Sequence, residues 1–223
     1  SGLASHDQMV GESPTNNFAV MNPLDNYYAS STFAEGNLKV THGGSSIYTF
    51  NQSTIAVSSG KWYAEVDVDQ VYSTLIGVAG QSSGATSDIL GSKNDQVGYY
   101  FDGTYYKNNS QTSYGNSYTT GDIIGIALDL DNNKLYFSKN GTFQNSGDPT
   151  SGATGTGAIS IPASSDTFNG SYTFAFGDFT NQSATSIANF GQDGTFAGNV
   201  TAGGNSDANG VGNFKYSVPS GYL

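Results

Sequence analysis

The feature that most restricts the fold of this chain is an alternation of apolar and polar residues with a period of two. It is clearest at residues 60–69 (GKWYAEVDVD), where one set of alternate residues is apolar: Trp62, Ala64, Val66 and Val68. The other set carries charges, so we expect a half-buried strand with a solvated outer face. No stretch of about ten residues combines helical periodicity with helix caps. The pattern therefore predicts an all-β protein.

The polar residues of the chain also favour strands and turns. Glu occurs only three times and Arg is absent, so most of the polarity comes from Ser, Thr, Asn, Gln and Gly. Glu and Lys, which favour helices, are few, whereas Thr favours strands and Asn and Gly favour turns. Only 36% of the residues are hydrophobic, but 13% are aromatic, and large rings build a core from few positions.

Further alternating segments extend the β pattern along the chain. We expect strands or hairpins at 35–41, 60–69, 75–80, 97–110, 122–141, 171–179 and 186–191. The hairpin at 97–110 turns at Asp102-Gly103. Residues 1–17 are polar and lack a pattern, which is typical of a linker or arm. Residues 18–223 show no break in composition, so we expect them to form one domain.

Composition excludes several classes of function. The formal net charge is −11 without any Arg, which argues against binding to nucleic acid or to anionic lipid. There is no apolar run of about 18 residues to insert into a membrane. Cysteine is absent, so disulfides and thiol chemistry are excluded. The start has no signal peptide and no initiator Met, so we expect a processed chain or a piece of a longer one.

A calcium loop is suggested by three oxygen-bearing side chains at alternate positions: Asp129, Asp131 and Asn133. Such a loop needs Gly at its sixth position and an acid at its twelfth. Counted from Asp129, this chain has Lys134 and Asn140 there. We therefore expect a hairpin with solvated acids, closed by the two-residue loop Asn132-Asn133, and no metal.

Catalytic groups are sparse. His6 and His42 lie outside any nucleophile motif and are interpreted as arm and turn residues, and two His without Cys do not make a zinc site. Asp67 and Asp69 share the outer face of one strand, roughly 7 Å apart, a spacing that would suit glycoside cleavage. Solvated acids on an exposed face are the preferred interpretation. We predict no catalytic residue and no cofactor, and an enzyme acting on polysaccharide is the weakest hypothesis.

A tyrosine-rich stretch at 99–118 is the strongest sign of binding. Tyr offers a flat apolar face and a hydroxyl at low entropic cost, and Asn can bond the hydroxyls of a sugar. The candidate ligand-binding residues are Tyr105, Tyr106, Asn108, Asn109, Tyr114, Asn116 and Tyr118. The alternative is that tyrosines in a hairpin are core, which we favour for Tyr99 and Tyr100 and leave open for the other four. Trp62 is interpreted as core.

Six segments follow one another in the order typical of a known family. They are GKWYAEVDVD, IGVAG, VGYYFDG, GDIIGIALDLDNNKLYFSKNG, YTFAFGDF and ANFG. In this order they resemble the SPRY domain, over about residues 18–223. The resemblance implies a bent β-sandwich of two antiparallel sheets that serves as a recognition module.

The flanking segments narrow the resemblance. SPTNNFAVMNPLDN, EGNLKVT and the tail from Asn189 are similar to SPRY-like modules in structural proteins of tailed, especially marine, bacteriophages. That similarity implies a place on a virion, in a tail fibre, appendage or capsid fibre. Expected partners are other virion proteins, a host surface glycan or protein, and a second copy of the chain. The first hypothesis is a non-catalytic module that binds the host, and the alternative is a purely structural virion segment.

Overall fold

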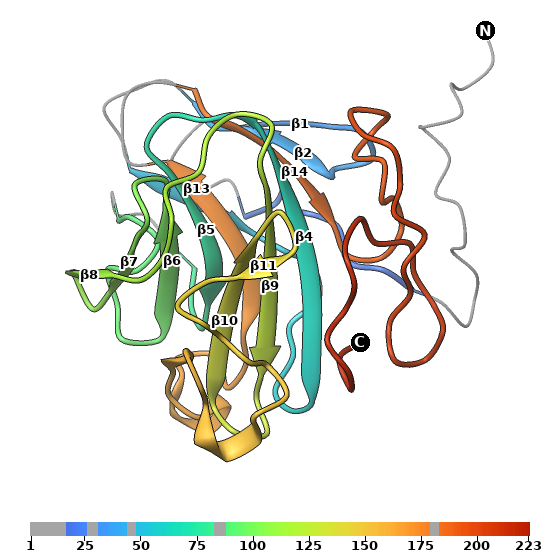
Figure 1. Ribbon diagram of the computed structural model, residues 1–223. Coiled ribbons are helices and arrows are strands. Elements are labelled where there is room, and N and C mark those ends of the chain that lie inside the picture. The colour runs from blue at the N-terminus through green and yellow to red at the C-terminus, as the bar shows by residue number, and fades with distance from the viewer. Residues whose placement is uncertain (1–16, 26–30, 44–47, 83–87, 179–182) are drawn as a thin grey trace, which may run out of the picture.

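The protein folds into two antiparallel sheets that lie face to face (Figure 1). This computed structural model describes residues 17–25, 31–43, 48–82, 88–178 and 183–223. Within them, helix is confined to two 3-10 turns, η2 (Gly152–Thr154) and η3 (Ser164–Asp166). No helix in these residues has the length and apolar character to cross a bilayer. The predicted all-β sandwich is confirmed.

Each sheet is built from strands distant in sequence. The eight-stranded sheet runs β1 (Thr32–Ala34), β2 (Lys39–Thr41), β14 (Thr185–Asn189), β4 (Lys61–Gln70), β9 (Ile123–Asp129), β10 (Lys134–Lys139) and β11 (Thr142–Phe143), with β12 (Ile159–Ser160) also paired to β10. The six-stranded sheet runs β3 (Thr49–Gln52), β13 (Thr173–Asp178), β5 (Thr74–Ala79), β6 (Gln96–Tyr100), β7 (Thr104–Lys107) and β8 (Ser110–Ser113).

The inward sides of the two sheets form the main core. β4 contributes the apolar set predicted from its alternation, and Val66 lies opposite Ile124 of β9 in the strand register. Phe137 of the eight-stranded sheet stacks on Tyr99 of the six-stranded sheet, with ring centroids 5.2 Å apart. Fully burying a side chain of this size stabilises the fold by about 1.5–3 kcal/mol. The core therefore depends on a few large rings, as the aromatic content predicts.

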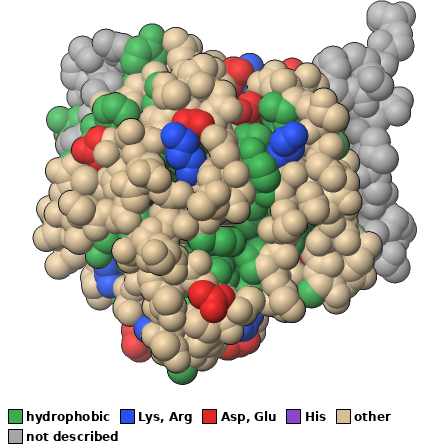
Figure 2. Space-filling model, in the orientation of Figure 1, with side chains coloured by type: hydrophobic (Ala, Val, Ile, Leu, Met, Phe, Trp, Pro, Cys, Tyr) green, Lys and Arg blue, Asp and Glu red, His purple; other side chains and the backbone are tan. Residues whose placement is uncertain are grey.

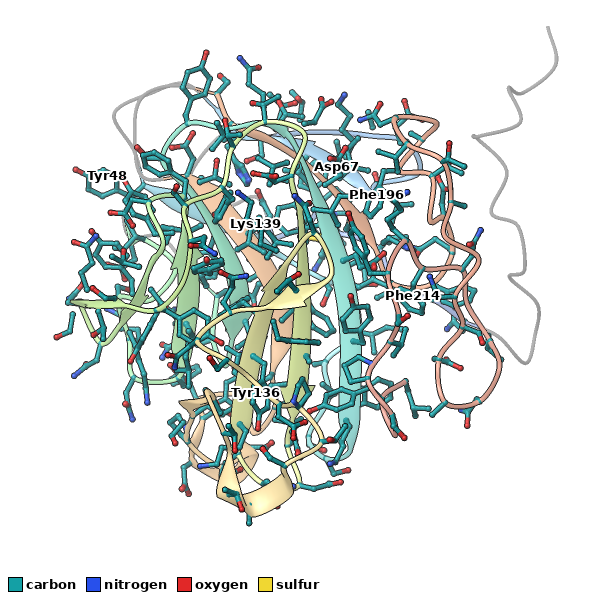
Figure 3. The ribbon with its side chains drawn as sticks, in the orientation of Figure 1. Tyr48, Asp67, Tyr136, Lys139, Phe196 and Phe214 are labelled. Carbon is teal, nitrogen blue, oxygen red and sulfur yellow. The ribbon has the colours of Figure 1, made fainter. Side chains whose placement is uncertain are left out.

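The outer face of β4 is not solvated, so that prediction is wrong. Residues 190–223, the C-terminal segment, run along this face (Figure 1). Under the segment, Tyr63, Glu65 and Asp67 are at most 3% exposed. Figure 3 shows Phe214 projecting from the segment toward the sheet, where its ring meets Tyr63 edge-on at 5.3 Å.

A buried carboxylate fixes the C-terminal segment to the sheet. Glu65 accepts hydrogen bonds from the backbone N–H groups of Lys215 and Tyr216, both at 2.8 Å. The Tyr63 hydroxyl and the Asn189 amide also donate to it. Burial raises the pKa of Glu65, because the charged form loses its hydration, and these hydrogen bonds oppose the shift. The acid takes the place of water for backbone donors in a segment that has no strand partner there.

The two predicted hairpin turns have different outcomes. The turn at Asp102-Gly103 joins β6 to β7 as expected, and Gly103 has the positive φ of 97° that such a turn requires. The loop between β9 and β10 has four residues, 130–133, instead of two, because Asp129 pairs with Lys134. Leu130 turns back into the core there and lengthens the loop.

Candidate functional site

The predicted tyrosine-rich site divides between core and surface. Tyr118 is buried, and its hydroxyl donates to the carbonyls of Thr74 and Tyr99, both at 2.9 Å. Tyr114 is also buried, and this burial raises its pKa to about 12. These two residues are therefore part of the core, and the prediction that they contact a ligand is corrected. Both pack on Tyr99, where three tyrosines share the space between the sheets.

The other five predicted residues lie nearer the surface but do not form one site. Tyr105 and Tyr106 are half-buried neighbours on β7, so their side chains point to opposite faces of the sheet. Asn108 and Asn109 form the exposed tip of the β7–β8 hairpin. Asn116 is exposed, and its carbonyl accepts the Tyr99 hydroxyl. Their binding role stays a prediction.

A hollow of about 310 Å³ lies at one end of the sandwich, where several segments that are distant in the sequence meet. Its apolar wall comes from Phe18, Ile55, Val57, Trp62, Phe174 and Phe190, and from Val211 and Leu223 of the C-terminal segment. We call it the Trp62 hollow. Its volume is at the lower end of the range typical of ligand pockets, which are mostly apolar with a few polar groups.

Polar groups at the rim of the Trp62 hollow have unused hydrogen-bonding capacity. Asp207 uses one carboxylate oxygen to accept the N–H groups of Asn209 and Val211, which shapes the loop. Its other oxygen makes no hydrogen bond to a described residue, and neither does the Asn209 side chain. The Trp62 indole is already satisfied by the Ser59 carbonyl at 2.7 Å. A ligand would thus meet apolar walls, one free carboxylate oxygen and the side-chain amides of Asn17 and Asn209.

Backbone hydrogen bonds between distant parts of the chain hold the walls of the Trp62 hollow in place. Leu223 pairs with β4 through its N–H to the Lys61 carbonyl and through its carbonyl to the Tyr63 N–H, at 2.9 and 2.7 Å. Val57 forms a β-bridge to Tyr172 just before β13. Trp62 packs against the main core as predicted, yet it also lines the hollow. The site was not foreseen because its walls come from positions far apart in the sequence. The single Trp was the only sequence signal near it.

The surface of the molecule is mostly neutral. In Figure 2, hydrophobic side chains gather in a band near the centre of the visible face, and charged side chains are few and scattered. In the described part of the chain, no three His, Asp or Glu side chains gather closely enough to hold a metal ion.

The acids suggested as calcium ligands are bonded to protein groups. Asp129 is buried and pairs with Lys61 at 3.1 Å, and it also accepts from Asn132. Asp131 accepts the Gly60 N–H at 2.8 Å. These acids join the β9–β10 loop to the start of β4.

Asp67 and Asp69 are tied together by a single amide. Asn199 donates to both carboxylates, at 2.9 and 3.1 Å, and Lys39 pairs with Asp69 at 2.8 Å. Burial under the C-terminal segment raises the pKa of Asp67, so the expected solvated pair is corrected. The segment occupies the space that a sugar would need between the two acids.

His42 is buried, not a surface residue in a turn. It follows β2, its Nδ1 lies 3.5 Å from the Ser31 hydroxyl, and its ring meets Phe176 edge-on. Burial lowers its pKa to about 4, since the charged imidazolium would lose its hydration. His6 lies outside the described residues. The earlier interpretation of His42 is therefore wrong.

Comparisons with known proteins identify the family. The model of the SPRY domain matches residues 61–178, just over half of the chain. The ATP-dependent RNA helicase DDX1 of Xenopus laevis is 35% identical over 130 residues, which cover 54% of this chain and 16% of the helicase. This chain therefore spans a small part of that relative's length.

A solved structure agrees on the fold. The SPRY domain of human HERC1 superposes with a TM-score of 0.57 over 75% of this chain and 96% of that domain, at 16% identity. Strands on both sides of the matched region, β1–β3 and β14, complete the two sheets. The chain belongs to the SPRY domain family of protein-interaction modules.

Proposed function

We propose that this chain is a non-catalytic recognition module that binds an extended segment of a partner protein in the Trp62 hollow. The observation that carries the proposal is the pairing of an aromatic hollow with unused polar groups of Asp207 and Asn209 at its rim. An apolar side chain of the partner would fill the hollow. The backbone N–H groups beside that side chain would donate to the free oxygen of Asp207. Membership of an interaction-module family supports a protein as the partner.

The absence of a catalytic role is part of the proposal. The Asp67–Asp69 pair is bridged and covered, and His42 is buried beside a serine hydroxyl that it meets only at 3.5 Å. Among the described residues, no Ser or Thr combines an exposed hydroxyl with a histidine base. These contacts favour binding over hydrolysis.

The proposed biological location of the module rests on the segments that flank the SPRY motifs in the sequence. We propose a place on a virion surface, as part of a tail fibre, appendage or capsid fibre that recognises a host surface protein. Labelling of purified particles with antibodies against this chain tests the setting. A host glycan, bound by the residues at 105–116 that remain exposed or half-buried, is the second candidate. A glycan array tests it.

Selection of peptides that bind the protein, from a displayed random library, tests whether the Trp62 hollow is a binding site. We expect the selected peptides to share one aromatic or large aliphatic residue. Ile55 is 38% exposed and lines the hollow, so Ile55→Arg should weaken peptide binding at least about tenfold by obstructing it. Leu24→Arg is the matched control, because Leu24 is 91% exposed and lies outside the hollow. Equal binding by both variants would overturn the proposed site.

A further inference from the structure

One edge of the six-stranded sheet is covered by another segment of the chain, and the other edge is open. At one edge β3 is fully buried, and residues 20–25 cover it. Asn22 donates its N–H to the Gln52 carbonyl at 2.8 Å, and Thr54 donates to the Val20 carbonyl at 2.7 Å. At the other edge β8 is fully exposed, and no described residue bonds to its outer side. Figure 1 shows β8 at the outer margin of the molecule.

The turn before β8 determines which of its backbone groups face outward. Asn108 and Asn109 have positive φ values of 51° and 58°, as in a type I′ turn. In that turn the N–H of Ser110 bonds to the carbonyl of Lys107. Antiparallel pairing uses alternate residues, so Ser110 and Thr112 bond to β7. Gln111 and Ser113 therefore direct their N–H and carbonyl groups away from the sheet.

The β8 edge lacks most of the features that protect natural edge strands from pairing, which are Lys or Pro residues, a bulge or a covering segment. Of the usual protections it has only its short length of four residues. β8 has the sequence SQTS, and residues 108–121 contain no charged residue in a chain of net charge −11. One acid lies beside this edge: the exposed carboxylate of Asp102 accepts from Thr104 and Gln111. Because β8 itself carries no charge, a second negatively charged copy would meet less repulsion there than at surfaces with several acids.

We infer that β8 is a homodimer contact, in which it pairs antiparallel with β8 of a second copy across a twofold axis. Twofold symmetry requires one residue to lie opposite itself. With Thr112 on the axis, Gln111 pairs with Ser113 of the partner subunit, and Ser113 pairs with the partner subunit's Gln111. All outward N–H and carbonyl groups of both strands are then satisfied. The two six-stranded sheets become one continuous sheet.

The expected dimer is weak, because a four-residue strand buries less than the roughly 1,200 Å² typical of stable complexes. It would form where copies are held close together or are concentrated. The contact does not depend on the Trp62 hollow, so either proposal can fail alone.

Disulfide trapping tests the pairing directly, because the natural chain has no Cys. On the axis, Thr112 faces Thr112 of the partner subunit in a non-hydrogen-bonded pair, whose Cα atoms lie about 4.5 Å apart and suit a disulfide. We expect Thr112→Cys to form a disulfide dimer in a glutathione buffer at least about tenfold faster than Ser110→Cys. Ser110 is the matched control, because it is equally exposed on the same face but would lie opposite the partner subunit's Tyr114.

Adding Gln111→Pro to Thr112→Cys removes an outward N–H without removing a bond to β7. This change should reduce the crosslinking rate to that of Ser110→Cys. Circular dichroism spectra of the variants check that the fold is kept. Equal crosslinking rates for Thr112→Cys and Ser110→Cys, or no effect of Gln111→Pro, would overturn the inference.

Discussion

The covered outer face of β4 and the uncovered β7–β8 hairpin show two ways in which a sheet meets its surroundings. Beneath the C-terminal segment, the outward residues of β4 are acids and a tyrosine that bond to irregular chain. On the hairpin, the outward residues are Ser, Gln and Thr, which are open to solvent. In these two regions, the charged outward residues therefore lie on a covered surface, and the neutral polar residues lie on an open one. A buried acid anchors the part of the C-terminal segment at Lys215 and Tyr216, which does not pair with a strand.

The largest expected effect is the loss of this anchor. Glu65→Ala leaves the N–H groups of Lys215 and Tyr216 without an acceptor under the C-terminal segment. We expect the free energy of unfolding in urea to fall by about 3–5 kcal/mol. Gln111→Ala, on the open hairpin, is the control. Similar unfolding energies for Glu65→Ala and the natural protein would mean that the segment is not fixed through this acid.

A second effect of burial is that the free energy of unfolding depends on pH through His42. Its pKa is about 4 in the folded protein and near 6.5 when unfolded, so the unfolded state binds more protons between these values. The stability due to neutral His42 is complete above pH 6.5 and is lost as the pH falls toward 4. The raised pKa values of Glu65 and Asp67 act in the opposite direction.

The His42→Gln variant separates these contributions. The unfolding free energy of the natural protein, relative to this variant, should fall by up to about 3 kcal/mol between pH 6.5 and pH 4. Urea titrations across this range measure the difference. A difference that is constant with pH would contradict a buried neutral His42.

Two amides make a smaller, matched comparison. Asn199 joins Asp67 and Asp69 beside the C-terminal segment, whereas Gln111 joins Asp102 and Thr104 on the open hairpin. We expect Asn199→Ala to cost about 1 kcal/mol, and Gln111→Ala less than about 0.5 kcal/mol. Thermal denaturation of both variants measures which of them loses more stability. The reverse ranking would mean that burial does not distinguish the two surfaces.

The sequence predicted those parts of the fold whose residues repeat an apolar pattern. β4, β9 and β10 were visible because aliphatic residues line one side of each strand. β8 was missed because Ser, Gln and Thr carry no hydrophobic signal, and β3 was missed because all four of its residues are buried.

The covering of Glu65 was unpredictable for a different reason. Its partners Lys215 and Tyr216 are about 150 residues away and bond through their backbone, which no side-chain pattern reveals. The Trp62 hollow was hidden in the same way, because its walls come from positions scattered between Asn17 and Leu223. Of the predicted site, only the exposed hairpin tip and its neighbours stay available to a partner.

The most direct test of the proposed function uses the single tryptophan of the chain, which lines the hollow. Trp62 fluorescence should change on titration with a selected peptide and saturate at the Kd measured independently by calorimetry. The Ile55→Arg variant should lose both signals together. Calorimetric binding of the peptide that leaves the Trp62 emission unchanged would place recognition elsewhere and contradict the account.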